Sequence, residues 1–128
     1  MENIEVGLQQ ARIADIHDIV SRYNDWAISS FPKSTPTSSL LGLRREVDET
    51  IEAIQLLDKH QKEVDGMFDT LFDSVRLEYA DCLMYLIDSA RRCGLSIDDL
   101  FFALDEKLQI KLQRDWKIND DNSYSHVK

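Results

Sequence analysis

The 128-residue chain is poor in the residues that interrupt helices, with only four Gly and two Pro. Such scarcity argues against an all-β fold, because the turns between strands draw heavily on these residues. A hydrophobic content of 43% argues against a disordered chain, and 30% charged residues are typical of a soluble globular protein. The sequence therefore predicts an all-α fold, and its length is sufficient for only one domain.

Positive charges are outnumbered, with 15 Lys and Arg against 24 Asp and Glu, and the formal net charge is −9. A protein that holds nucleic acid through its phosphates needs a basic surface, so we expect no nucleic acid partner. A phosphorylated small ligand is compatible with this charge only if a metal ion bridges it to the acidic residues.

Cysteines and long apolar runs are likewise rare. Cys82 and Cys93 lie on one predicted helix, about 16 Å apart along its axis, which is too far for a disulfide. Two thiols without a disulfide framework indicate a reducing compartment. No run approaches the roughly 20 apolar residues of a membrane span, and the N-terminus MENIEVG lacks the basic start of a signal peptide. We therefore expect a cytoplasmic protein without membrane contact.

Apolar residues recur at three- and four-residue steps in four stretches, which predict four main helices in an antiparallel bundle. We expect the first from Glu5 to Ser29 and the second, capped by Thr37 or Ser38, to end near Leu57. The third spans 68–93, with Gly94 placed to terminate it, and the fourth spans 96–116. Residues 1–118 then form the single domain, and the polar segment 119–128 is expected to be a disordered tail.

Two acids stand in an unusual place on the second predicted helix. Glu46 and Glu49 are three residues apart on a strip that they share with small and apolar residues, such as Gly42 and Ala53. A carboxylate in such surroundings needs a cation or a hydrogen-bond donor. The alternative is that both acids lie at the edge of an ordinary helix face.

The third predicted helix repeats this pattern. Most of its circumference is apolar, and its narrow polar strip carries Glu78, Asp81, Tyr85 and Asp88. Glu78 and Asp81 are again an acid pair three residues apart. This strip can also be only the solvated side of a packed helix.

Two antiparallel helices with such pairs can bring four carboxylates to one point, which provides the hard oxygen ligands that Mg²⁺ or Mn²⁺ prefers. Zinc is a poor candidate because His17, His60 and His126 are scattered along the chain. Di-iron bundles share the shape but use a Glu-x-x-His motif, which this sequence lacks. The missing motif argues against a metal-carboxylate oxidase of bundle type, which we keep as an alternative function.

The order of these motifs resembles that of the MazG-type all-α nucleoside triphosphate pyrophosphohydrolases, near their dATP/dGTP or dCTP branches. The resemblance extends over most of the chain and combines an aromatic segment, the acid pairs 28 residues apart and a closing basic-aromatic motif. The matching segments are Trp26-Ala-x-x-x-Phe31-Pro32, SSLLGLRREVDETIEA with Glu46-x-x-Glu49, EYADCLMYLIDSARRCGLSIDDL with Glu78-x-x-Asp81, and Lys107-x-x-x-Lys111-x-x-Arg114-x-Trp116. Lys111 departs from the family, which usually has Asn at this position.

This resemblance implies hydrolysis of a nucleoside triphosphate to the monophosphate and pyrophosphate, as nucleotide-pool housecleaning. It implies that Glu46, Glu49, Glu78 and Asp81 bind Mg²⁺, or Mn²⁺, and that Glu49 orients or deprotonates the attacking water. Cationic side chains would neutralise the phosphates. These are Lys107 and Arg114, with Lys111 and Lys33 as further candidates.

Aromatic side chains are the candidates for base contacts, because their faces stack on any base. Trp26 and Phe31 are candidates to stack on the base, but Trp26 lies on the apolar stripe of its helix, which favours a core position for it. Tyr85 and Asp88 line up with Asp81 and are candidates for the sugar or base, or for a subunit contact. The loop 31–38 carries hydroxyls next to a helix N-terminus and can touch phosphate, or it can simply turn the chain.

The resemblance also implies a homodimer or a dimer of dimers, which agrees with a third helix that is apolar nearly all round. An alternative function from another class is a non-catalytic helical module that binds a protein partner with the same bundle.

Overall fold

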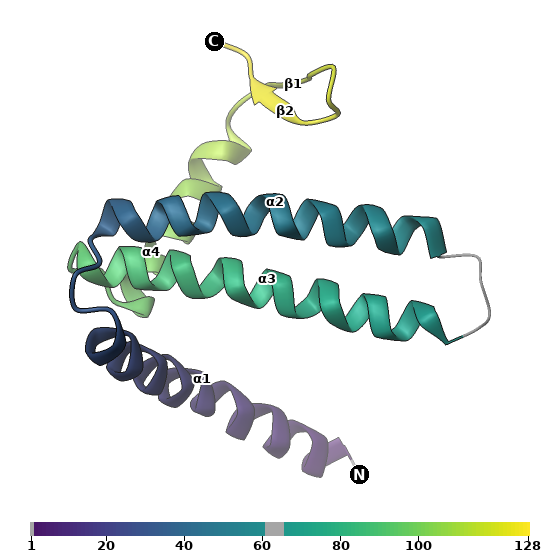
Figure 1. Ribbon diagram of the computed structural model, residues 1–128. Helices are drawn as coiled ribbons and strands as arrows, with labels where there is room; N and C mark the ends of the chain where they lie inside the picture. The colour runs from purple at the N-terminus through teal and green to yellow at the C-terminus, as the bar shows by residue number, and fades with distance from the viewer. Residues whose placement is uncertain (1, 61–65) are drawn as a thin grey trace. The chain divides into compact units, whose positions relative to one another are not determined.

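The computed structural model describes the backbone of residues 2–60 and 66–128, with side chains from Asp15 onward (Figure 1). The predicted helices are all present within this part of the chain. They are α1 (Glu2–Ser30), α2 (Pro36–His60), α3 (Met67–Arg92) and α4 (Ile97–Leu112). Two short strands follow, β1 (Trp116–Ile118) and β2 (Tyr124–His126). The chain divides into two compact units, residues 1–97 and 98–128.

In the first unit, α2 and α3 run side by side along their length, and α1 crosses α3 (Figure 1). A polar contact joins the two long helices: Oγ1 of the buried Thr50 lies 3.4 Å from Sγ of Cys82, and it also donates to the carbonyl oxygen of Glu46 within α2 at 2.7 Å. Gly66 directly precedes α3, and its φ of 81° lies in the left-handed region that glycine tolerates. Residues 61–65 of the predicted connection lie outside the described residues.

Local sequence explains where α2 begins and where α3 ends. Thr35 and Ser38 form a reciprocal cap at the start of α2, with Thr35 N to Ser38 Oγ at 2.8 Å and Ser38 N to Thr35 Oγ1 at 3.1 Å. The cap therefore starts at Thr35, earlier than the predicted Thr37 or Ser38, because two hydroxyls cooperate across the first turn. Gly94, at φ 93°, follows α3 as predicted, and Leu95 N donates to the carbonyl of Ala90 at 2.9 Å.

The second unit contains α4 and an antiparallel hairpin in which Trp116 pairs with His126. The structure differs here from the disordered tail predicted for 119–128. The turn is closed by Asn119 N to the carbonyl of Ser123 at 2.7 Å, and Asn122 takes the left-handed conformation at φ 68°. Asn and Asp favour such turns, so the polar composition that suggested disorder in fact encodes a hairpin turn.

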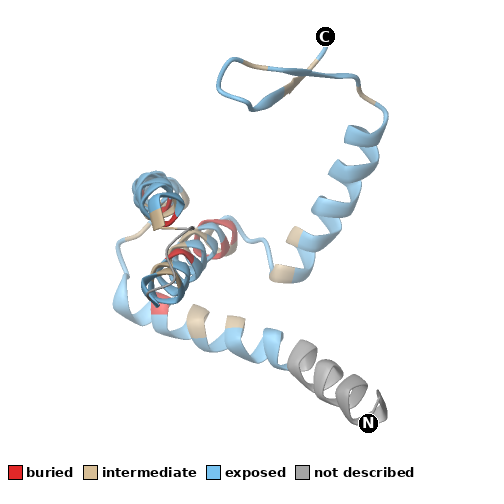
Figure 2. Ribbon diagram, turned by 90° about the vertical axis from the view of Figure 1, so that its right-hand side faces the viewer, coloured by how far each residue is buried: buried red, intermediate tan, exposed pale blue. Residues whose placement is uncertain are grey.

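The core of the first unit is small, and Figure 2 shows no buried position on α4. Within the described side chains the buried apolar residues are Ala27, Leu57, Val75, Ile87 and Ala90. Many larger apolar side chains of α2 and α3 stay exposed, including Val47, Ile51, Phe72, Leu77 and Leu83. Among the helices of the described ranges, none has the length and apolar run that a bilayer crossing requires.

Candidate metal centre and adjoining pocket

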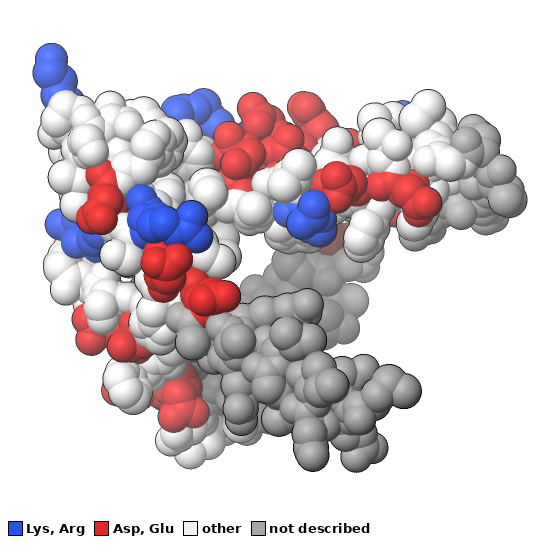
Figure 3. Space-filling view, turned by 90° about the horizontal axis from the view of Figure 1, so that it is seen from below, with Lys and Arg blue, Asp and Glu red and all other residues white. Residues whose placement is uncertain are grey.

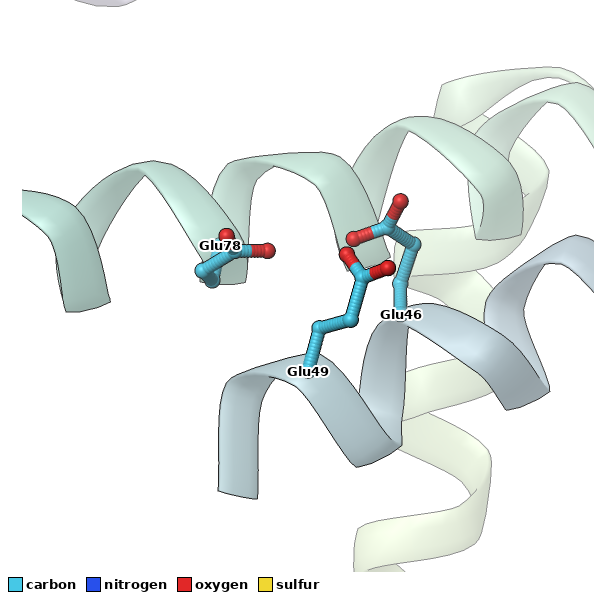
Figure 4. Close-up of side chains that lie close together, drawn as sticks. All are labelled: Glu46, Glu49 and Glu78. Atoms are coloured by element: carbon cyan, nitrogen blue, oxygen red, sulfur yellow. The ribbon is translucent and has the colours of Figure 1, made fainter. Parts of the chain in front are cut away.

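Three carboxylates from α2 and α3 meet at the contact between these helices (Figure 4). Glu46 and Glu49 project from successive turns of α2, and Glu78 faces them from α3. One oxygen of each lies within 4.8 Å of the others. The i, i+3 spacing seen in the sequence puts the two α2 acids on one face, and the packing of α3 brings the third acid to them.

The electrostatics of this cluster favour a cation. Burial, the carboxyl groups of Glu49 and Glu78 and the nearby charge of Asp81 raise the pKa of Glu46 from 4.5 to about 7. In the described part of the chain, Oε2 of Glu46 and Oε2 of Glu78 are buried without a hydrogen-bond donor. Carboxylate oxygens only accept, so grouped acids without donors are unfavourable unless a proton or a metal ion lies between them. The residues therefore fit a divalent metal ion.

Asp81, the fourth predicted acid, is exposed and stands beside this cluster. The structure thus brings together three of the four predicted acids, and Asp81 acts on Glu46 through its charge. Both residues also line a neighbouring pocket of about 470 Å³. The cluster therefore adjoins the pocket, and Glu46 belongs to both.

This pocket lies where the end of α1, the start of α2 and the C-terminal half of α3 meet, and aromatic rings form one wall. Trp26 and Phe31 contact each other edge to face, with centroids 5.2 Å apart. Trp26 is 55% exposed in this wall, so it is not the core residue that its stripe also allowed. Ala27 takes the buried position, because the small residue fits where α1 approaches α3.

Sequence reasoning missed several lining residues. Tyr23 lies in the aromatic wall, and its hydroxyl donates to the carbonyl oxygen of Met84 at 2.7 Å; burial, the foremost cause, raises its pKa to about 12. Arg45 adds a cation next to Glu46. The position of Arg45 directly before Glu46 in the sequence could have indicated this. Met84 lines the pocket only because of tertiary packing, which the sequence pattern does not reveal. Lys33 is exposed and is not among the residues that line the pocket.

Asp88 lines the pocket but is not free for a sugar or base. Its carboxylate accepts from Ser39 Oγ at 2.5 Å, Arg91 Nη2 at 2.6 Å and Arg92 Nε at 2.8 Å. Burial acts to raise its pKa, but these hydrogen bonds outweigh burial and hold the pKa below the usual value. Asp88 therefore belongs to the structural support of the pocket.

Tyr85 also lines the pocket, and its ring rests against Gly42 of α2. A Cβ at this buried glycine would overlap Cε1 of the ring and lie 2.7 Å from both Cδ1 and Cζ. The Gly42→Ala variant is therefore expected to displace Tyr85 and to lower the free energy of unfolding by about 1–3 kcal/mol, the usual cost of overpacking. Urea unfolding measures this.

The Tyr85→Ala variant provides the matching control for Gly42. If the added methyl group acts by displacing the Tyr85 ring, the Gly42→Ala change should cost much less in a Tyr85→Ala background than in the parent. A Gly42→Ala protein as stable as its parent would contradict the tight contact.

Three of the predicted phosphate-binding cations, Lys107, Lys111 and Arg114, belong to the second unit, which contains a pocket of its own of about 730 Å³. Lys111 and Arg114 line it together with the hairpin residues Trp116, Lys117 and His126. Lys111 Nζ lies 5.7 Å from the centroid of the Trp116 ring, and Trp116 Nε1 donates to the Lys111 carbonyl at 3.2 Å. Lys107 is exposed on α4 and is not among the lining residues. The basic motif thus forms a local surface that the hairpin extends.

Comparisons with known proteins agree with this fold. The model of the dATP/dGTP pyrophosphohydrolase family matches residues 19–128, which include the hairpin. No curated protein sequence matches the chain. Among solved structures, the chain is similar to the cyanophage S-2L MazG-like pyrophosphohydrolase bound to dGDP and three catalytic Mn²⁺ ions per active site, with 22% identity and a TM-score of 0.61. The match covers 87% of this chain and 95% of that chain.

The helices, acid cluster and family match together define a hydrolase that acts on nucleotides and carries a group of carboxylates able to hold a metal ion. The chain belongs to the dATP/dGTP pyrophosphohydrolase family.

Proposed function

We propose that this enzyme hydrolyses a deoxynucleoside triphosphate, with Mg²⁺, to the monophosphate and pyrophosphate, and so removes unwanted nucleotides from the pool. The observation that carries this proposal is that the acid cluster adjoins an aromatic-walled pocket and shares Glu46 with it. A metal-bound polyphosphate beside a stacking surface is the arrangement that a nucleotide needs. The family match supports the same substrate class.

The acids would divide their roles by position. Glu46, Glu49 and Glu78, with Asp81, would hold Mg²⁺, which neutralises phosphate charge and makes a bound water more acidic. Glu49 is the most exposed of the three clustered acids, so it can orient or deprotonate water at the open side of the cluster. The water oxygen would bond to the α-phosphorus as the bond to the bridging α,β oxygen breaks, and pyrophosphate would leave.

Cationic side chains would neutralise the remaining phosphate charge. Arg114 suits bidentate contact with a terminal phosphate, and Lys107 and Lys111 add positive charge along α4. Lys33 can add a cation from the loop before α2.

Trp26 is expected to contribute most of the base stacking. Removing it in Trp26→Ala should raise KM about 10- to 100-fold, because stacking on one aromatic ring is worth about 1–3 kcal/mol per base. The turnover number should change little, since the acids are untouched. Ile28→Ala, an exposed apolar change on the same helix, is the control and should leave KM unaltered. Equal KM values for parent and Trp26→Ala would remove Trp26 from the substrate site.

A panel of ribo- and deoxynucleoside triphosphates, incubated with Mg²⁺ and assayed for pyrophosphate, tests the proposed reaction. Pyrophosphate and monophosphate in equal amounts, with a preference for a purine deoxynucleotide, are the expected products. Release of orthophosphate would mean a different cleavage position. Absence of any hydrolysis across the panel would favour the helical interaction module instead.

Homo-oligomerisation would cover the apolar surface left open in one chain. In the described part, no large side chain is fully buried, and many of the large apolar residues of α2 and α3 are 42–57% exposed. A monomer rarely leaves so much apolar area in water. Light scattering at micromolar concentration should therefore report a dimer or tetramer, and a mass of 14.9 kDa would contradict the proposal.

A further inference from the structure

The C-terminal end of α1 receives its cation from another helix. Its last turn has no basic residue, although a helix end leaves carbonyl oxygens and partial negative charge without partners. Nη1 of Arg92, the final residue of α3, donates to the carbonyl oxygen of Ser34 at 2.9 Å. Its Nη2 donates to the carbonyls of Phe31 at 3.1 Å and Ala27 at 3.4 Å. One guanidinium group therefore holds both the end of α1 and the loop behind it.

The start of α2 receives an acidic side chain from α3. Its first turn has no acidic residue, although a helix N-terminus favours negative charge. Asp88, one turn before Arg92 on α3, accepts from Ser39 in that first turn and from Arg92. The side chains of Asp88 and Arg92 are only 7% and 11% exposed. A single buried ion pair thus provides charge for the ends of two helices and fixes the corner between them.

This corner carries the aromatic wall of the pocket. Phe31, whose carbonyl oxygen accepts from Arg92, lies edge to face against Trp26. Trp26 directly precedes Ala27, the α1 residue whose carbonyl oxygen also accepts from Arg92. The carboxylate of Asp88 reaches the pocket with both oxygens already bonded to protein donors. Movement of the corner would therefore move the wall without touching the acid cluster.

We propose that Asp88 and Arg92 are positioning residues for nucleotide binding, which set the aromatic wall by clamping the end of α1 and the start of α2 to α3. This inference rests on the proposed function only for the identity of the ligand. The clamp acts on binding of the base and leaves the metal ligands in place.

The Arg92→Lys variant tests the clamp, because Lys keeps the charge but cannot reach Asp88 and three carbonyls together. KM is expected to rise about tenfold, the equivalent of about 1.4 kcal/mol, while kcat stays within about twofold. Mn²⁺ affinity should be unchanged. Hydrogen exchange of the amides in 27–39 should accelerate, while that in 40–60 should not.

Arg91→Lys is the matched control. Arg91 binds the same carboxylate, through Nη2 to Oδ1 at 2.6 Å, but among the described residues it donates to none of the loop carbonyls that Arg92 holds. The Arg91→Lys variant should have the KM and the amide hydrogen-exchange rates of the parent. If Arg92→Lys fails to fold, Asp88→Asn is used instead. Its KM and hydrogen-exchange rates should change in the same direction by a smaller factor.

Two results would overturn the clamp: an unchanged KM in a folded Arg92→Lys variant, or a loss of Mn²⁺ affinity that equals the loss of nucleotide affinity. If the parent hydrolyses no nucleotide, the proposed reaction fails, but equilibrium binding of dATP and dGTP and the exchange rates still decide the clamp. Faster exchange with unaltered nucleotide binding would leave Arg92 as a stabilising residue only and would refute the positioning role.

Discussion

Replacing Glu46 by Gln should reduce pyrophosphate formation by at least about a hundredfold, the scale expected when one preorganised charge partner of the transition state is removed. Gln keeps the size and one oxygen of Glu but lacks the negative charge that attracts a divalent ion. Glu46 also belongs to both the acid cluster and the pocket, so its loss affects metal and nucleotide together. Steady-state kinetics over a range of Mg²⁺ concentrations measure the effect. Excess Mg²⁺ should recover only part of the rate.

Glu52→Gln is the control for this experiment. Glu52 is exposed on the same helix as Glu46 but lies outside the acid cluster. Its replacement by Gln makes the same change in net charge. Its variant should retain full turnover. A Glu46→Gln enzyme as active as Glu52→Gln would show that the cluster is only a group of surface acids.

Metal affinity should depend strongly on pH below neutrality, because Glu46 has a pKa of about 7 in the metal-free protein. Above this pH the carboxylate is free to bind a cation. Below it a proton must leave first, so Mn²⁺ affinity should fall about tenfold for each pH unit. Between about pH 7.5 and about pH 5.5 the expected loss is about 25-fold. Titration calorimetry with Mn²⁺ measures it, and a constant affinity over this range would contradict the prediction.

Without metal, the pH dependence of stability should have the opposite sign. The folded protein keeps a proton on Glu46 up to about pH 7, whereas the unfolded chain releases it near 4.5. The folded state therefore binds more protons in this window, and the free energy of unfolding should decrease as pH rises from 4.5 to 7. Urea unfolding in a chelator tests this: Glu52→Gln should retain the decrease, and Glu46→Gln should lose most of it.

Helical periodicity made much of this molecule predictable. The spacing of Glu46 and Glu49 places them on one helix face whatever surrounds them, and Gly94 ends α3 through its own backbone freedom. The acid cluster was thus accessible to sequence reasoning, since it needed only the further assumption that α2 and α3 pack side by side. Figure 3 also shows acidic side chains in groups over the visible face, with basic ones between them, in keeping with the net charge of −9.

Contacts between residues far apart in sequence were not predictable in the same way. Asp88 looked like a ligand residue because its strip is polar, but Ser39 and Arg92 occupy it in the folded chain. The apolar stripe of α1 is compatible with two positions of Trp26: in the core, or in the wall of a pocket. The stripe alone does not distinguish them. The hairpin was missed because its turn depends on a few polar hydrogen bonds around Asn119 and Ser123, and not on an apolar pattern.

A crystal structure with Mn²⁺ and a nonhydrolysable deoxynucleoside triphosphate tests the central claim most directly. We predict anomalous Mn²⁺ density between the carboxylates of Glu46, Glu49 and Glu78, with phosphate oxygens among the remaining ligands and the base against Trp26. Density for Mn²⁺ elsewhere, with these three carboxylates free of metal and the nucleotide outside the pocket, would contradict the account.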